Sequence, residues 1–411
     1  MKITELRLND IGKKALFFFV FFVPIFYFTN MNFGNATLRI GQEQAFQIGA
    51  VILYALVLLE NIYLALFLLL SVATYLGHNF SGGNYLVNIV YGCIIYQVSY
   101  QIIDSKTISQ AFKVVLWLVF LNIIWLILQN TGNELLFVEV STQKLGNMNN
   151  VAMMGLKAMM GMFFALSIPI MAFFNPMIAL LFFIPIWLSE SSISIIAGVA
   201  SLGFFIFLRL SRRWKTVVAI LSMIAIFYTF QDSKANMMAD RFDIWKITLR
   251  DAMQKPISGW GLDAFRNINL KEKTFNYFKN VPTNKSGHGI YIQETKQFLL
   301  PDDCKGSSGP IDPWDHPHNE YVSLFFEYGV LGVIIFLLLS RDMMRRFNRS
   351  DDALVCLAGF FISLLIISVA QFPFHLARIG VFIPVFLGAY YRITDDSIKL
   401  EQITKGVIYG E

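Results

Sequence analysis

Residues Tyr321 to Leu339 read YVSLFFEYGVLGVIIFLLL, an apolar run in which Glu327 is the single charged residue. A helix needs about 20 mainly apolar residues to cross the hydrocarbon layer of a membrane. The run does not alternate between apolar and polar residues, and it is much longer than a strand of a membrane barrel. We therefore predict a transmembrane helix, because only that structure satisfies the hydrogen bonds of a single lipid-embedded segment internally.

Similar apolar runs recur on both sides of this one, and the composition agrees with them. Hydrophobic residues make up 56% of the chain and charged residues only 15%, so lipid has to cover much of the apolar surface. The sequence predicts an all-α integral membrane protein with about 12 transmembrane helices. Their approximate ranges are Ala15 to Phe28, Ala45 to Leu59, Ile62 to Leu76, Tyr85 to Ile103, Ile108 to Gln129, Val151 to Phe174, Met177 to Leu188, Ser191 to Leu210, Trp214 to Phe230, Tyr321 to Leu339, Leu354 to Phe372 and Ile379 to Tyr391.

The distribution of Lys and Arg predicts the topology, because cytoplasmic connections are enriched in them. Alternate connections differ sharply in their number of Lys and Arg residues. On the side with fewer of them, the short connections hold only Arg39, Lys144 and Arg378. This pattern predicts a bacterial inner-membrane protein with both termini cytoplasmic and a large periplasmic loop at 231–318, between helices 9 and 10. Residues 1–230 would form helices 1 to 9, and residues 319–411 would form helices 10 to 12 and a cytoplasmic tail, all in one integrated membrane domain. The richer connections contain Lys2, Arg7, Lys13, Lys14, Lys106, Lys113, Arg209, Arg212, Arg213, Lys215, Arg341, Arg345, Arg346, Arg349, Arg392, Lys399 and Lys405.

Cysteines and charge exclude two other classes of protein. Cys93 and Cys356 fall in apolar runs and Cys304 in the loop, which does not indicate a disulfide framework. The net charge of +5 is spread over short clusters, which is typical of topology signals rather than of nucleic-acid binding. The amino terminus has no small-residue cleavage site and is interpreted as a retained first helix, not a signal peptide.

The loop contains a short amphipathic helix, predicted at Asp240 to Met253. Its segment Arg241-Phe-Asp-Ile-Trp245 places Arg241 and Trp245 one turn apart on one face. Arg is well matched to a phosphate through bidentate, charge-assisted hydrogen bonds. The simpler interpretation is a solvated or interfacial arginine.

The loop re-enters the membrane through Asp315-His-Pro-His-Asn-Glu-Tyr321. Pro317 favours an extended residue before it, and Asn319 could cap the following helix. His318 would then lie at the outer surface of the same membrane, where a His is suited to accept a proton near neutral pH. His316 and His318 with Asp312 and Asp315 could instead hold a metal ion, because alternate residues of an extended chain share a face.

Other outer segments bring further polar groups to the same side of the membrane. Lys157 lies one or two turns inside its predicted helix, behind the amide-rich entry Gly146-Asn-Met-Asn-Asn150. It could snorkel or face a polar cavity. The last outer turn, Gln371 to Arg378, adds His375 and Arg378, whereas Glu190 in a short outer turn is expected to be solvated.

These stretches resemble the O-antigen ligase and O-antigen polymerase superfamily. Beyond the architecture, the resemblance is carried by Gly146 to Asn150, Arg241 to Trp245, Pro256-Ile-Ser-Gly-Trp-Gly-Leu262, His316 to Tyr321, and Glu327-Tyr-Gly-Val-Leu-Gly332. It implies a GT-C-like fold and transfer of a glycan from an undecaprenyl-diphosphate-linked donor, without metal or cofactor. The acceptor would be lipid A-core for a ligase, or a growing glycan for a polymerase.

The resemblance also implies roles for residues. Arg241 would bind the diphosphate and stabilise its leaving charge, and His318 would orient or deprotonate the acceptor hydroxyl. Substrate-binding residues would include Trp245, His316, Asn319, Asn147, Asn149, Asn150, Lys157 and Arg378.

The sequence departs from the family at one position. Ligases of this family commonly have an Arg in the outer turn between helices 7 and 8, whereas this turn reads Leu188-Ser-Glu-Ser-Ser-Ile-Ser194. Either Arg378 or Lys157 replaces that cation or the donor is held differently, and the departure weakens the assignment to ligase proper. Ligase and polymerase are kept at near parity, because they share the fold and the donor chemistry. The alternative class is a transporter or flippase of lipid-linked glycans, which would predict internal repeats and charges near the bilayer midplane.

Overall fold

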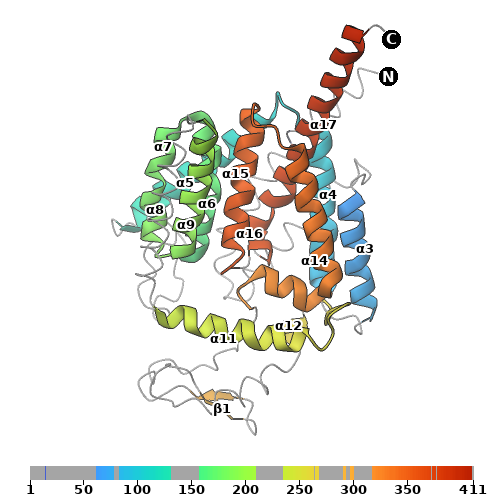
Figure 1. Ribbon diagram of the computed structural model, residues 1–411. Coiled ribbons are helices and arrows are strands. Elements are labelled where there is room, and N and C mark those ends of the chain that lie inside the picture. The colour runs from blue at the N-terminus through green and yellow to red at the C-terminus, as the bar shows by residue number, and fades with distance from the viewer. Residues whose placement is uncertain are drawn as a thin grey trace.

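The computed structural model describes residues 14, 62–77, 83–130, 157–209, 235–262, 264–267, 290–292, 297–299, 317–371, 373–375 and 377–409. Nearly all of this part is helical (Figure 1), which confirms the predicted all-α class. Its two strands, β1 (Ile290–Ile292) and β2 (Gln297–Leu299), form an antiparallel hairpin with Tyr291 opposite Phe298. The helices are α3 (Ile62–Gly77), α4 (Gly83–Ile102), α5 (Ile108–Asn130), α6 (Lys157–Phe174), α7 (Pro176–Leu181), α8 (Phe183–Leu188), α9 (Ser192–Arg209), α11 (Ala235–Ala252), α12 (Ala264–Asn267), α14 (Glu320–Arg346), α15 (Asp352–Ile367), α16 (Ala377–Gly380) and α17 (Phe382–Tyr409), with a 3-10 turn η3 at Pro373–His375.

Within the described residues, helices occur where the sequence predicts spans, with one correction. The range 177–188, predicted as one helix, consists of α7 and α8. Pro185 has no N–H to donate to the carbonyl of Leu181, and the chain tightens at Phe182, whose N–H bonds the Ala179 carbonyl at 3.3 Å. The predicted spans 15–28, 45–59 and 214–230 lie outside the described residues, so the number of spans stays a prediction.

Two of the described helices are long and apolar enough to cross a membrane, at Ile108–Leu128 and Glu320–Arg346. Shorter apolar helical stretches accompany them at Ile62–Thr74, Ala158–Phe174, Ser192–Leu208 and Asp352–Ile367, and at Pro176–Leu188, which comprises α7 and α8.

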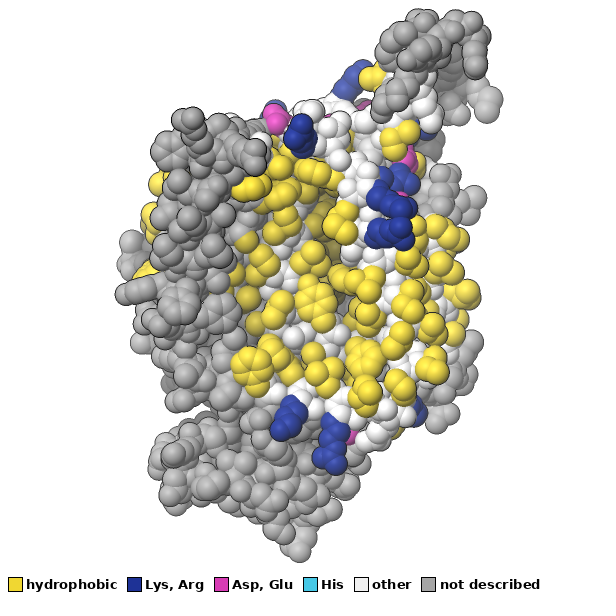
Figure 2. All heavy atoms as spheres, in the orientation of Figure 1, with side chains coloured by type: hydrophobic (Ala, Val, Ile, Leu, Met, Phe, Trp, Pro, Cys, Tyr) yellow, Lys and Arg dark blue, Asp and Glu magenta, His cyan; other side chains and the backbone are white. Residues whose placement is uncertain are grey.

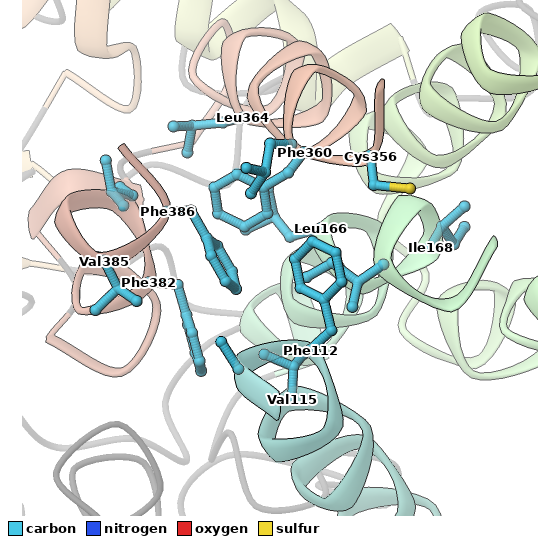
Figure 3. Packing of buried hydrophobic residues seen from close by; sticks show 14 of the residues in the cluster. Phe112, Val115, Leu166, Ile168, Cys356, Phe360, Leu364, Phe382, Val385 and Phe386 are labelled. Atoms are coloured by element: carbon cyan, nitrogen blue, oxygen red, sulfur yellow. The ribbon is translucent and has the colours of Figure 1, made fainter. Parts of the chain in front are cut away.

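Aromatic side chains fill the centre of the bundle. Phe112 of α5, Phe360 of α15 and Phe386 of α17 are at most 1% exposed, and their rings converge between these helices (Figure 3). The Phe360 and Phe386 ring centroids are 4.9 Å apart in an edge-to-face arrangement, which is a favourable geometry for aromatic pairs. Glycines let backbones approach where helices cross, as at Gly388 of α17, where a Cβ would come within 2.8 Å of the Ser99 Cβ.

The outer surface of the bundle carries an apolar belt. Leu69, Trp117, Trp187 and Leu337 are 59% to 71% exposed. Figure 2 shows hydrophobic side chains across the middle of one face, with Lys and Arg side chains above and below them. An exposed apolar band of this extent is typical of a lipid-facing surface and not of an aqueous one.

A cluster of charged residues lies at the cytoplasmic end predicted for the bundle. Arg346 of α14 pairs with Asp342 at 2.9 Å and with Asp395 of α17. The Tyr100 hydroxyl of α4 also donates to Asp395, at 2.7 Å. The carboxyl-terminal part of α17 projects from this end, whereas α11 lies across the opposite end (Figure 1). The predicted cytoplasmic and loop segments are thus separated by the length of the bundle.

Candidate functional site at the loop end of the bundle

Helix α11 carries the first predicted motif and packs against the beginning of α14. It begins at Ala235, earlier than the predicted Asp240, and ends at Ala252. Ile244, Thr248 and Asp251 are buried; their spacing of three and four residues gives one face. Arg241 and Trp245 are one turn apart in this helix, as predicted, although the side chain of Arg241 lies outside the described part of the chain.

Trp245 connects α11 directly to the second predicted motif. Its indole N–H donates a hydrogen bond of 2.8 Å to the carbonyl of Pro317, the residue before His318. The Phe242 ring packs edge-on against Trp245, with centroids 5.1 Å apart. The helix that bears Arg241 and the segment that bears His318 are therefore held together by a specific contact.

His318 has an unusual backbone conformation, with φ of 52°. Left-handed backbone is uncommon outside glycine, although His, Asn and Asp adopt it several times more often than other residues. Such a conformation costs about 1–3 kcal/mol and persists where the surroundings impose it. His318 is half-buried between its two neighbours, Pro317 and Asn319, which are buried.

Asn319 caps helix α14, as the sequence predicts. Its side-chain oxygen accepts hydrogen bonds from the N–H groups of Tyr321 at 2.9 Å and Val322 at 3.0 Å. The backbone of Asn319 is extended, with φ of −155°, as is usual for a capping residue. The cap fixes where the helix starts and hence where His318 lies.

Glu320 ties this segment to the outer turn that follows α15, a role that sequence reasoning missed. Its carboxylate accepts a hydrogen bond of 2.9 Å from the N–H of Phe374, and its own N–H donates to the Ser368 carbonyl at 2.9 Å. The Tyr321 hydroxyl also donates to the Leu365 carbonyl, at 2.7 Å. An acidic residue in the first turn of a helix was the available signal, but it did not identify the partner.

The turn that Glu320 contacts leads to two other predicted residues. His375 is the last residue of η3 and Arg378 lies in α16, just beyond Phe374 along the chain. Their side chains lie outside the described part. The structure thus brings the backbone of the Arg378 turn to the His318 segment, as expected for outer segments that converge.

The stretch Pro256 to Leu262 pairs with α14 where that helix is broken. Gly329 has φ of 63° and ψ of −158° inside α14. The Val330 N–H donates to the Pro256 carbonyl at 2.8 Å, and the Phe326 and Glu327 carbonyls accept from Trp260 at 2.8 Å and Gly261 at 3.0 Å. The loop segment therefore satisfies backbone groups that the break would leave without helical partners.

Two glycines make this close pairing possible. A Cβ on Gly329 would lie 2.6 Å from the Pro256 carbonyl oxygen, and a Cβ on Gly259, whose φ is 68°, would lie 2.5 Å from the Tyr328 nitrogen. The ring of Trp260 stacks on Phe326 with a centroid distance of 6.3 Å. We call these residues, 256–261 with 326–330, the loop–helix lock.

The first turn of α6, which begins with Lys157, leads to a contact with the turn between α8 and α9. The side chain of Lys157 lies outside the described part. One turn later, Gly161 packs against Ser189 in the turn between α8 and α9, and a Cβ on it would lie 3.0 Å from the Ser194 hydroxyl. Glu190 in this turn is exposed, as expected of a solvated residue, and has φ of 55°.

Several predicted site residues fall outside the described chain. They are Asn147, Asn149, Asn150 and His316. Asp312 and Asp315, which with the histidines formed the alternative metal site, are also outside it. The described residues contain no group of three or more His, Cys, Asp or Glu placed to hold a metal ion.

The apolar belt and the helical bundle are typical of a helical membrane protein, and the polar contacts described above lie at one end of the bundle. Within this class, residues 177–337 match the family model described as O-antigen ligase, which confirms the resemblance to the O-antigen ligase and polymerase superfamily. The matched range includes α11, the loop–helix lock and His318, but not Asn147, Lys157 or Arg378. No curated protein matches the chain.

Proposed function

We propose that this protein transfers a glycan from an undecaprenyl-diphosphate-linked donor to an acceptor hydroxyl at the periplasmic face of the inner membrane. The observation that carries the proposal is the hydrogen bond from Trp245 to the Pro317 carbonyl. It holds the helix that bears Arg241 against the residue next to His318. The reaction requires a phosphate-binding side chain and a proton acceptor in one site, and this contact brings α11 to the segment that bears His318.

The two residues have complementary roles in the transfer. The acceptor oxygen forms a bond to the anomeric carbon of the donor while the bond from that carbon to the diphosphate breaks. The diphosphate leaves with the electron pair, and Arg241 stabilises its charge. His318 accepts the proton that the acceptor hydroxyl loses.

Loss of His318 tests the proton-acceptor role, and two substitutions separate it from the backbone effect. His318→Ala removes the imidazole, whereas His318→Asn also removes it but keeps a residue type that tolerates left-handed backbone. Both variants should insert into the membrane and retain donor binding, and both should lose transfer. Full activity in the Asn variant would refute the assigned role.

Loss of Arg241 tests the diphosphate contact. Arg241→Ala should raise the apparent KM for the donor and lower kcat, because the cation acts on both bound and leaving diphosphate. Arg341→Ala is the control, since Arg341 is exposed at the opposite end of the bundle. An Arg241 variant with both constants unchanged would contradict the contact.

The acceptor distinguishes a ligase from a polymerase, and deletion of the gene identifies it. Full-length glycan accumulating on the lipid carrier indicates ligation to lipid A-core. Core carrying a single repeat indicates polymerisation of a growing glycan. Unchanged lipopolysaccharide and lipid-linked glycans would refute both and favour the transporter alternative.

A further inference from the structure

Helix α11 carries a stripe of exposed apolar side chains. Phe242 is 55% exposed, Leu249 41% and Met253, directly after the helix, 65%. The Met253 N–H still bonds the Leu249 carbonyl at 3.0 Å, so the helical path continues to it. Spacings of seven and four residues place these three side chains on one stripe.

Basic residues border this stripe on one side. Lys246 and Arg250 are both exposed and one turn apart. At about 100° per residue, Lys246 and Arg250 lie along one edge of the stripe, on the side opposite to Trp245. Trp245 is the residue that bonds Pro317. The charged flank is therefore distinct from the face that serves the proposed transfer site.

Exposed apolar side chains of the belt reach the end of the bundle at which α11 lies (Figures 1 and 2). Helix α11 lies across the end of the bundle (Figure 1). In the same orientation, hydrophobic side chains extend down to this end of the face, and Lys and Arg side chains lie below them (Figure 2). A helix with an apolar face and an adjacent basic flank fits the boundary between acyl chains and headgroups.

We propose that α11 is an interfacial helix that contacts phospholipids of the outer leaflet. Phe242, Leu249 and Met253 insert among the upper acyl chains, and Lys246 and Arg250 contact the headgroup phosphates. This contact also fixes how deep the transfer site lies in the membrane, an inference that rests on the proposed function. Because Trp245 joins α11 to Pro317, His318 is held at the level where the diphosphate of a lipid-linked donor lies.

Spin-label accessibility in nanodiscs tests the contact without any donor. The full-length chain with Cys304→Ser is labelled at Met253→Cys and reconstituted in phosphatidylethanolamine and phosphatidylglycerol. Leu337→Cys, in the apolar belt, provides the lipid reference, and Ser350→Cys, in an exposed turn at the opposite end, provides the aqueous reference. The unsubstituted Cys304→Ser chain gives the background from Cys93 and Cys356, which are buried.

The label at residue 253 should have an oxygen-to-nickel accessibility ratio several-fold above that at residue 350 and close to that at residue 337. A second label at Gln254→Cys, exposed beside the stripe, should give a lower ratio than residue 253. A residue 253 ratio equal to that of residue 350 would overturn the proposal, whether or not the protein transfers glycans. Conversely, a membrane-inserted α11 in a protein without transfer activity would refute only the proposed function.

Discussion

Substituting Gly329 by Ala tests whether the loop–helix lock holds the site together. Gly329 has φ of 63° and ψ of −158°, a region that side chains essentially exclude. An added Cβ would also lie 2.6 Å from the Pro256 carbonyl oxygen, and the Ile257 carbonyl is closer still. Because these are backbone atoms, no side-chain rotation relieves the overlap. The segment 256–261 has to move away from α14.

The expected magnitude follows from two contributions. Forcing an alanine into this positive-φ conformation costs about 1–3 kcal/mol. Displacing Pro256 also breaks the hydrogen bond from Val330, which contributes about 1 kcal/mol. The docking of 256–261 should therefore weaken by about 3 kcal/mol, which corresponds to roughly a hundredfold in the equilibrium constant.

Hydrogen–deuterium exchange of the peptide 256–262 measures this equilibrium. The Trp260 and Gly261 amides donate to Phe326 and Glu327, so their protection reports the docked state. Gly92→Ala is the matched control, since a Cβ at Gly92 of α4 would meet nothing within 4 Å. The reasoning fails if Gly329→Ala leaves protection at 260 and 261 as high as Gly92→Ala does.

Three further perturbations address individual contacts. Trp245→Phe removes the donor to Pro317, worth about 1 kcal/mol, and should lower kcat with little change in the donor KM; a raised KM alone would indicate a substrate contact instead. Asn319→Ala should destabilise the protein by about 1 kcal/mol in thermal unfolding, whereas Asn319→Asp, which keeps the accepting oxygen, should not; equal losses would argue against the cap. Asp395→Asn weakens the pair with Arg346, which is partly exposed, so its cost should stay below about 1 kcal/mol and shrink in high salt, with transfer unchanged.

Local sequence signals predicted those helices and caps whose formation depends on the residues of one continuous stretch. Apolar length located the helices around α5, α9 and α15, and the residue type of Asn319 predicted the cap that forms. The break between α7 and α8 was missed although Pro185 marks it. A proline in the first turn of a helix costs no intrahelical hydrogen bond, because the N–H groups there have no partner within the helix, and an apolar run gives no further sign of a second start.

Contacts between distant segments were not predictable in the same way. In the sequence, Gly329 is a glycine within a long apolar helix, and nothing local separates a packing glycine from one with positive φ. Its conformation depends on residues 256–261, which supply the hydrogen bonds that the break leaves open. Similarly, Glu320 reads as a favourable first-turn residue, and its bond to Phe374 exists only once α15 has folded back.

The stretches that carry the family resemblance are mutually dependent in physical terms. Arg241 to Trp245 bonds Pro317 through the indole, and the stretch from Pro256 bonds α14 through its backbone. Both attachments act on one segment, because His318 and Asn319 precede the part of α14 that ends at the break. If either attachment is lost, that short helical piece keeps the bonds of Glu320 and Tyr321 to α15 and the turn after it but loses one of its two attachments to the loop. We therefore expect His318 to be positioned less precisely relative to α11. A site assembled in this way depends on loop docking as much as on its reactive side chains, so we expect substitutions in the loop–helix lock to reduce transfer without touching substrate.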